Sequence, residues 1–253
     1  MIKKVVHDIK DRNIRVDDLQ RNELKIIQNP KLYTFTMDAV LLAHYATVKK
    51  NYNIVDLGTG TGVIPLIIST RADINKILAV EIQEQLFELT LKSVNLNKLN
   101  NVIKVINEDV REGLPSIAKN RYDLVTLNPP YLKYDSNIKK TSKNIGRSEL
   151  CGNLEDFISL AAKLLKVGGR LAMVQSSHRL ADTIAILKKY NLEPKRFRMV
   201  QSTTVKEPGI FLLETIKGAK AGLKVGPVLI IYNELNEYTK EVANIYYGKG
   251  GLL

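Results

Sequence analysis

The sequence predicts an α/β fold in which a mainly parallel sheet carries helices on both faces. Short apolar runs, each long enough for one buried strand, alternate along the chain with stretches of helical spacing. A glycine-rich turn joins the first of these strands directly to an apolar helix. Four successive predicted strands run into a polar residue at their carboxyl ends, which is typical of a sheet that binds a ligand along that edge.

The predicted elements follow one another in regular alternation. Helices are expected at residues 63–71, 154–166 and 181–190. Strands are expected at residues 53–57, 77–82, 102–110, 122–127, 170–175, 197–201 and 210–216. Gly168 and Gly169 are expected to end the second helix. Residues 51–253 would then form the main domain, and residues 1–50 an N-terminal extension that covers one edge of it.

The glycine-rich turn contains Gly58, Gly60 and Gly62, which permit a sharp turn and the close approach of a ligand to the backbone. Its pattern is close to the dinucleotide fingerprint, but Val63 occupies the place of the last glycine. Asp56 precedes the turn at the strand end, where a carboxylate would repel a pyrophosphate and suit a cation. S-adenosylmethionine carries a sulfonium and an ammonium group, so the charge favours this cofactor.

Two further acids lie where the next strands end. Glu81, followed by Ile82, comes about twenty residues after the glycine turn, which suits a carboxylate that binds ribose hydroxyls. Asp109 ends the third predicted strand, and we expect it to accept a hydrogen bond from the adenine amino group while Val110 packs against the ring. Because ligands of open α/β sheets bind along the carboxyl edge, these side chains form one predicted cofactor site.

The fourth strand runs into Asn128, Pro129, Pro130 and Tyr131. The two prolines stiffen the turn and remove backbone donors, so the Asn128 amide oxygen and the Pro129 carbonyl can lie close together as acceptors. Tyr131 offers a flat face beside them. Two acceptors that hold the hydrogens of a conjugated NH2 group would favour a tetrahedral, more nucleophilic nitrogen. We therefore predict a catalytic corner at these four residues, with Asn128 also bordering the cofactor site.

On these motifs the chain resembles the class I S-adenosylmethionine-dependent methyltransferases, and more narrowly the bacterial valine-tRNA adenine-37 N6-methyltransferases. The resemblance covers nearly the whole chain. It also includes residues 25–30, 35–42, 206–209 and 238–242. It implies a Rossmann-like, seven-stranded sheet of order 3-2-1-4-5-7-6 and methylation of adenine N6 in tRNA. It further implies that Thr36 and Asp38 close over the methionine end of the cofactor, although Met37 stands where relatives often have a smaller residue.

The charge of the chain favours a polyanionic partner. The formal net charge is +12, and residues 101–200 carry 18 basic against 10 acidic residues. Residues 51–100, which hold the predicted cofactor site, carry 4 basic against 5 acidic residues. The excess therefore lies around and beyond the catalytic corner, where phosphate contacts would be made. The predicted nucleic-acid-binding residues are Lys133, Lys139, Lys140, Lys143, Arg147, Lys195, Arg196 and Arg198.

Composition indicates a cytoplasmic enzyme without a metal. The sequence has no run of eighteen apolar residues and no signal-like start. A single cysteine, Cys151, excludes an internal disulfide and a cysteine-rich zinc site. His44 and His178 are more easily explained by packing or capping than by catalysis, since the corner needs no strong base. Tyr33 and Phe35 suit either the pocket or the core.

Other functions fit parts of the pattern. The same corner occurs in enzymes that methylate protein glutamine amides, but those usually carry a large N-terminal helical domain. Methylation of guanine N2 in ribosomal RNA is a second alternative. A non-catalytic RNA-binding protein on the same scaffold would not need an intact glycine turn and corner. A nicotinamide-dependent dehydrogenase is disfavoured by Val63.

Overall fold

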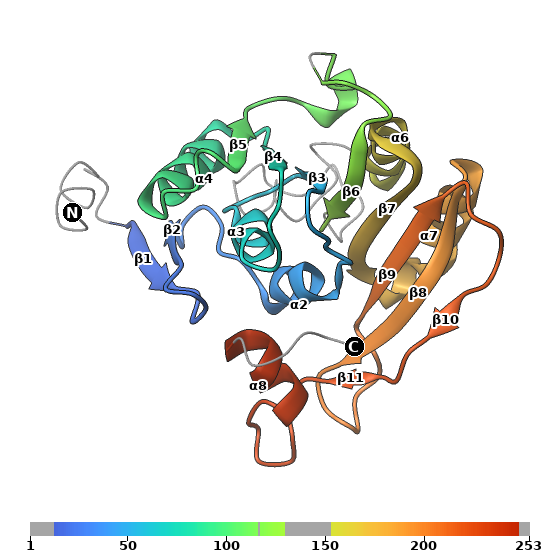
Figure 1. Ribbon diagram of the computed structural model, residues 1–253. Coiled ribbons are helices and arrows are strands. Elements are labelled where there is room, and N and C mark those ends of the chain that lie inside the picture. The colour runs from blue at the N-terminus through green and yellow to red at the C-terminus, as the bar shows by residue number, and fades with distance from the viewer. Residues whose placement is uncertain (1–12, 116, 130–152, 248–253) are drawn as a thin grey trace, which may run out of the picture.

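The computed structural model describes residues 13–115, 117–129 and 153–247, and its centre is a nine-stranded sheet (Figure 1). Seven of the strands lie side by side in the order β5-β4-β3-β6-β7-β9-β8. The short strands β10 and β11 both pair with β8, at successive positions along its outer edge. The predicted count of seven is therefore too low by these two strands, each only two residues long. Their bounds are β3 Asn53–Leu57, β4 Lys76–Val80, β5 Ile103–Ile106, β6 Tyr122–Leu127, β7 Leu165–Ser176, β8 Leu192–Gln201, β9 Ile210–Lys217, β10 Lys224–Val225 and β11 Leu229–Ile230.

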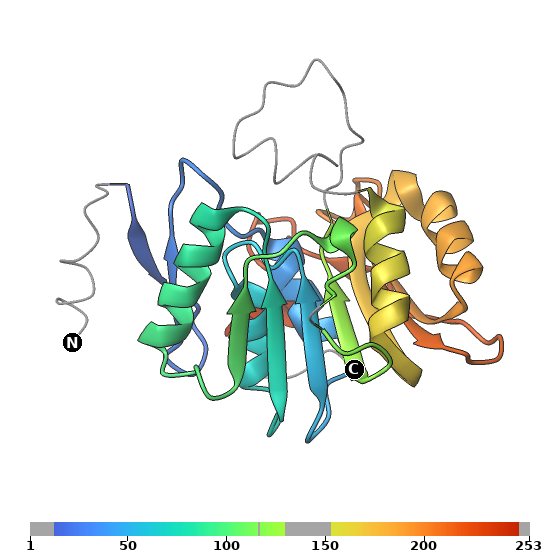
Figure 2. The same cartoon turned by 90° about the horizontal axis from the view of Figure 1, so that it is seen from above.

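Strand direction brings the carboxyl ends of the central strands to one edge. Strands β3 to β7 pair in parallel, whereas β9 runs antiparallel to both β7 and β8. In Figure 2 the arrowheads of β3, β4, β5 and β6 point the same way, toward the upper side of the view. The loops that follow β3, β4, β5 and β6 therefore meet along a single edge, as the alternating pattern predicts.

Helices cover both faces of the sheet (Figures 1 and 2). Helices α2 (Met37–Tyr45), α3 (Val63–Ser69) and α8 (Lys240–Tyr247) pack on one face, with Leu41, Leu66 and Ile245 in a shared core. Helices α6 (Leu154–Leu164) and α7 (Leu180–Lys189) pack on the other face. Neighbouring residues on a strand face opposite sides, so Ile54 joins the first core and Val55 the second. Burial on both faces explains why the central strands are almost entirely apolar.

The junction between α6 and β7 differs from the prediction. The helix ends at Leu164, and the glycine pair lies inside β7 instead of ending a longer helix. The pairing of β6 with β7 shifts register between Tyr122 and Leu124, next to these glycines. A Cβ atom on Gly169 would lie 2.9 Å from the Lys166 carbonyl oxygen and 3.0 Å from that of Tyr122. The glycine therefore serves a strand irregularity where two backbones approach closely.

The N-terminal segment supports one end of the carboxyl edge. Strands β1 (Arg15–Asp18) and β2 (Lys25–Gln28) form an antiparallel hairpin that packs on helix α4 (Glu84–Leu96). The Ser93 hydroxyl accepts the Ile27 N–H at 2.9 Å, and the Asn97 side chain bonds both the N–H and the carbonyl of Lys25. Helix α2 then enters the main core. The predicted domain boundary at residue 50 stays a prediction.

Candidate active site

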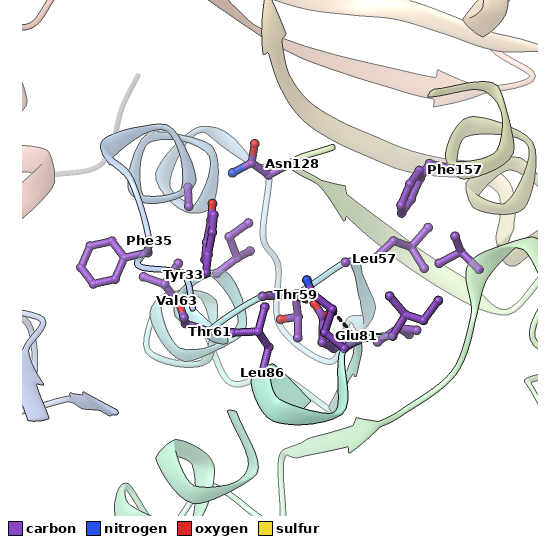
Figure 3. Close-up of a pocket in the computed structure, with 18 of the residues that line it drawn as sticks. Tyr33, Phe35, Leu57, Thr59, Thr61, Val63, Glu81, Leu86, Asn128 and Phe157 are labelled. Carbon is purple, nitrogen blue, oxygen red and sulfur yellow. Dashed lines mark hydrogen bonds between the residues drawn. The ribbon is translucent and has the colours of Figure 1, made fainter. Parts of the chain in front are cut away.

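A pocket of about 810 Å³, part of it open to solvent, lies at the carboxyl edge of β3, β4 and β6 (Figure 3). The predicted site residues Gly58, Gly60, Glu81, Ile82, Val110 and Asn128 all line it. Tyr33, Phe35 and Ala39 reach it from the N-terminal segment, and Phe157 reaches it from α6. The structure thus brings together the glycine turn, the second acid and the first residue of the corner.

The glycine turn is left-handed at each of its three glycines, with φ of +68°, +60° and +83° at Gly58, Gly60 and Gly62. Gly62 does not line the pocket, and its role is packing. A Cβ atom there would lie 2.6 Å from Cγ2 of Thr90 on α4. The Thr90 hydroxyl in turn donates a 2.8 Å hydrogen bond to the Gly60 carbonyl. Helix α4 therefore holds the turn in place from below, and this contact requires a glycine at residue 62.

Glu81 is the acid that faces the pocket. Its carboxylate accepts the backbone N–H of Gly60 at 2.8 Å and that of Gln83 at 2.9 Å. Burial raises the pKa of Glu81 to about 7, against the lowering effect of these backbone donors, and the nearby Asp56 charge raises it further. The backbone bonds fix the position of the carboxylate. Hydroxyl groups of a ligand could donate to its remaining lone pairs, as predicted for a ribose.

Asp56 does not line the pocket, which corrects the prediction of a direct contact with a cationic ligand. Its side chain lies beneath the glycine turn, where the Thr59 and Thr126 hydroxyls donate to its two oxygens, each at 2.6 Å. Burial raises the pKa of Asp56 to about 6, and both hydroxyl donors oppose that rise. Asp56 therefore ties the glycine turn to β6 and acts on the pocket through Thr59, which does line it.

Asp109 also lies outside the pocket lining, where Glu108 and Val110 are found instead. The side chain of Arg111 donates to both carboxylate oxygens of Asp109, and this pairing lowers the Asp109 pKa. The predicted hydrogen bond from an adenine amino group to the Asp109 carboxylate therefore has no support in the geometry. The strand β5 ends at Ile106, three residues before Asp109, so the polar residue nearest the strand end is Asn107. Asn107 donates to the carbonyls of Glu81 and Ile82 and joins the ends of the two strands.

Of the predicted catalytic corner, Asn128 and Pro129 lie among the described residues. Asn128 is half-buried and lines the pocket, and Pro129 behind it is buried. Pro130 and Tyr131 lie outside the described residues, as do Lys133, Lys139, Lys140, Lys143 and Arg147. Thr36 and Asp38 flank the start of α2 but do not line the pocket, where their neighbour Ala39 is found.

The pocket has the chemistry that an adenosyl cofactor needs. Thr61 lines the pocket, and its buried Oγ1 atom has no hydrogen-bond partner among the described residues. Apolar side chains, among them Ile82, Val110 and Phe157, suit the faces of a flat ring. Sequence reasoning missed Thr61, Glu108 and Phe157. Thr61 could have been found, since it lies within the glycine turn, but no local signal links Phe157 to this pocket.

Two of the predicted nucleic-acid contacts are bonded to other parts of the chain. The guanidinium group of Arg198 bonds both carboxylate oxygens of Glu241, at 2.5 and 2.8 Å, and its side chain is only 9% exposed. Arg196 donates to the Tyr45 carbonyl and the Thr47 hydroxyl, and its guanidinium lies 4.4 Å from the centroid of the Tyr45 ring. These arginines fasten α8 and α2 to β8, which corrects their prediction as phosphate contacts. Lys195 is exposed only in part and donates to the Lys220 carbonyl.

Residues 13–115, 117–129 and 153–247 contain neither a candidate metal site nor a membrane-spanning helix. No group of three or more histidine, cysteine, aspartate or glutamate side chains in that part of the chain could hold a metal ion. Within the same residues, no helix combines the length and the apolar character needed to cross a membrane.

Comparison with known proteins identifies the family. The tRNA1(Val) (adenine(37)-N6)-methyltransferase of Flavobacterium johnsoniae is 24% identical over 227 residues, which cover 89% of this chain and 96% of that protein. The protein of the same name from Porphyromonas gingivalis is 28% identical over 196 residues, or 76% of each chain. A solved structure from Agrobacterium tumefaciens, described as a predicted O-methyltransferase, matches with a TM-score of 0.70 at 21% identity, covering 85% of this chain and 98% of that one. This likeness confirms the Rossmann-like class I methyltransferase fold. The family model for the methyltransferase small domain matches residues 36–198, and the chain therefore belongs to that family.

Proposed function

We propose that this protein transfers a methyl group from S-adenosylmethionine to the N6 amino group of an adenine in tRNA, with adenine 37 of valine tRNA as the preferred target. The observation that carries the proposal is that Asn128 lines the same pocket as the glycine turn and Glu81. An acceptor pair for an amino group thus borders a site suited to an adenosyl ligand. The names of the relatives support adenine and tRNA as the substrate.

The residues of the pocket have distinct roles in this proposal. Glu81 would accept hydrogen bonds from the ribose hydroxyls. The backbone of the turn from Gly58 to Gly60 would lie against the cofactor. Val110 and Ile82 would pack against the adenine ring of the cofactor. We also propose that Thr36 and Asp38, at the start of α2, close over the methionine end of the cofactor. When bound, S-adenosylmethionine supplies an electrophilic methyl group.

At the corner, Asn128 Oδ1 and the Pro129 carbonyl oxygen would each accept a hydrogen bond from one N–H of the target amino group. This holds the nitrogen in place and weakens the conjugation of its lone pair with the ring. Tyr131 would stack on the target base, which must leave its own stack to enter the site, at a cost of a few kcal/mol for an unpaired base. The methyl group would pass from the sulfonium sulfur, which leaves as a neutral thioether, to N6, and the methylated nitrogen would then release one proton to water. Orientation and fixed dipoles would supply the rate, so no strong general base is required for the transfer.

The basic segment from Lys133 to Arg147 directly follows the corner in the sequence and is proposed to contact tRNA phosphates, together with Lys195. Arg196 and Arg198 are not included, because their guanidinium groups are bonded within the chain. We also infer a cytoplasmic location, where tRNA is found.

Methyl transfer from labelled cofactor tests the function directly. The purified protein is incubated with labelled S-adenosylmethionine and, in parallel, with bulk tRNA, ribosomes or peptide release factor. We expect label only in tRNA, and nucleoside mass spectrometry should find it in N6-methyladenosine. Label in ribosomal guanine or in a release-factor glutamine would support one of the alternatives and contradict the proposal. No transfer to any acceptor, despite cofactor binding, would favour a non-catalytic RNA-binding protein.

A further inference from the structure

Tyr33 lies in the wall of the pocket and has no role in the function proposed above. Its side chain is half-buried and lines the pocket. The Cε1 atom of its ring is 3.6 Å from the position that a Cβ atom on Gly60 would take. In Figure 3 the Tyr33 side chain extends from the glycine turn toward Asn128, whereas the ring of Phe35 points away from Asn128. The Tyr33 ring therefore borders the part of the pocket between the turn and the corner.

A tight turn after β2 fixes the backbone of Tyr33. The N–H groups of Leu32 and Tyr33 both donate to the Asn29 carbonyl, at 2.9 and 3.1 Å. The Tyr33 ring packs against a small apolar cluster that includes Leu86 and Leu89 of α4. An aliphatic side chain of similar size would serve this packing as well. The packing alone therefore does not explain why an aromatic ring lies in the wall of the pocket.

The pocket extends across the edge of the sheet from one face to the other. Val110 and Phe157 belong to the core on the α6 face, whereas Ala39 belongs to the core on the face of α2 and α3. In the proposed function, the adenine of the cofactor lies at the Val110 end and its ribose lies at Glu81. The sulfonium and methionine groups then extend toward α2. Tyr33 comes from the segment that leads into α2 and lies at this end of the pocket (Figure 3).

The acids near the pocket are engaged elsewhere, so the positive charge of a sulfonium group needs another partner. Asp56 does not line the pocket, and its two oxygens accept threonine hydroxyls. Glu81 accepts two backbone N–H groups and is assigned to the ribose. The face of an aromatic ring attracts a cation that lies within about 6 Å of its centroid, and the attraction is stronger where water is excluded. Tyr33 offers such a ring at the end of the pocket where the sulfonium group is expected.

Building on the proposed function, we propose that the face of the Tyr33 ring binds the sulfonium group of S-adenosylmethionine by a cation–π interaction. Tyr33 thereby selects the charged cofactor over its neutral product. After methyl transfer the sulfur is a neutral thioether, and the ring no longer attracts it. Tyr33 is a cofactor-binding residue that favours binding of S-adenosylmethionine and release of S-adenosylhomocysteine.

Calorimetry on the purified protein tests this preference without any acceptor RNA. For the wild-type protein we expect S-adenosylmethionine to bind about 5- to 20-fold more tightly than S-adenosylhomocysteine. Tyr33→Phe keeps the ring and should preserve most of this ratio. Tyr33→Leu removes the ring and should bring the two Kd values to within about twofold of each other, mainly because S-adenosylmethionine binds more weakly.

Stepwise fluorination of the ring separates its electrostatic role from packing. Phenylalanine carrying one, two or three fluorine atoms is introduced at residue 33, and each fluorine withdraws electron density from the ring face with little change in size. We expect the Kd of S-adenosylmethionine to rise with each fluorine, while the Kd of S-adenosylhomocysteine changes by less than about twofold. A ring that only packs would give no such trend.

Phe157→Leu is the matched control, since its ring lines the pocket at the adenine end. This variant should weaken the binding of both ligands by the same factor and leave their ratio unaltered. A larger loss of the ratio in Phe157→Leu than in Tyr33→Leu would assign the sulfonium contact to the wrong ring and overturn the inference.

Two further outcomes would overturn the inference even if Tyr33→Leu does not fold. One is equal affinity of the wild-type protein for the two ligands, and the other is an affinity for S-adenosylmethionine that does not respond to fluorination. Failure to methylate tRNA, with the preference for S-adenosylmethionine intact, would refute the proposed substrate and leave this inference standing. Failure to bind either ligand would refute the proposed function and this inference with it.

Discussion

The two halves of the carboxyl edge differ in how their polar groups are satisfied. On the cofactor side, Glu81 is held by the N–H groups of Gly60 and Gln83, and Asp56 by two threonine hydroxyls. On the other side, Asn128 is half-buried and lines the pocket, and the enclosed amide nitrogen of Gln175 on β7 has no hydrogen-bond partner among the described residues.

This difference indicates that one half is preformed and the other is completed by its ligand. A pocket whose acids are already positioned by the backbone can bind a small cofactor with little rearrangement. In the proposed function, the acceptors of the corner bind the amino group of the target base, so this half of the site is completed only when that base is present. The comparison predicts that changes on the cofactor side alter stability and affinity, whereas changes at the corner alter turnover.

The largest effect is expected for Asn128→Ala. Loss of one acceptor at the corner should lower the single-turnover rate of methyl transfer about 10²- to 10³-fold, a size typical for the loss of one preorganised polar group. Cofactor affinity, measured by calorimetry, should change by less than about threefold. Asn95→Ala, an exposed change on α4, is the matched control and should leave both quantities unaltered. Near wild-type turnover by Asn128→Ala would remove the corner from the mechanism.

Gly62→Ala should destabilise the protein by about 2–4 kcal/mol, because the new Cβ meets Cγ2 of Thr90 at 2.6 Å and the residue has a φ of +83°. Urea unfolding measures this loss. Thr90→Ser removes Cγ2 and keeps the hydroxyl that bonds Gly60, so the double variant should recover part of the stability. Gly209→Ala, which meets nothing within 4 Å, should be nearly neutral. If Gly62→Ala were as stable as Gly209→Ala, the turn would not be held from α4 as described.

Glu81→Gln should weaken cofactor binding about 10- to 100-fold and remove its pH dependence. In the wild-type protein the pKa of Glu81 is raised to about 7, and ligand hydroxyls favour the ionised form. Affinity should therefore fall as the pH drops below about 7. In the free protein the same raised pKa predicts that the free energy of unfolding decreases as the pH rises from the ordinary glutamate pKa toward about 7, and is constant above it. Calorimetry and urea unfolding over that range would detect both trends, and a flat affinity profile in the wild type would argue against a ligand on this carboxylate.

The smallest effect concerns the arginines outside both halves. Arg198→Met should cost about 1 kcal/mol of stability, because the paired Glu241 is itself partly exposed, and tRNA affinity should change less than about twofold. Lys195→Met should do the reverse, with unchanged stability and affinity weaker by about two- to threefold at low salt. Thermal melting and tRNA binding titrations distinguish the two. A large loss of tRNA affinity in Arg198→Met would show that Arg198 contacts tRNA.

Local patterns in the sequence predicted most of the strands and helices of the fold. Alternating apolar runs and helical spacing predicted the central strands and helices α3, α6 and α7, since each element depends on side chains that are close in the chain, but helix α4 after β4 was missed. The exceptions are instructive. Gly168 and Gly169 suggested the end of a helix but lie within β7, because the glycine is required by the approach of β6 rather than by its own neighbours in sequence.

What the sequence determined by itself is the order of the elements, the glycine turn with its left-handed residues, and the polar side chains near the strand ends. Only the tertiary structure decided which of those side chains face the pocket. Asp56 is turned away by Thr126, seventy residues later, and Asp109 by Arg111, while Glu81 stays in the lining. The place of Phe157 in the pocket lining and the bonds of Arg196 and Arg198 within the chain likewise come from contacts between distant strands and helices. Such contacts depend on the packing of elements against one another, which local turn chemistry and side-chain periodicity do not specify.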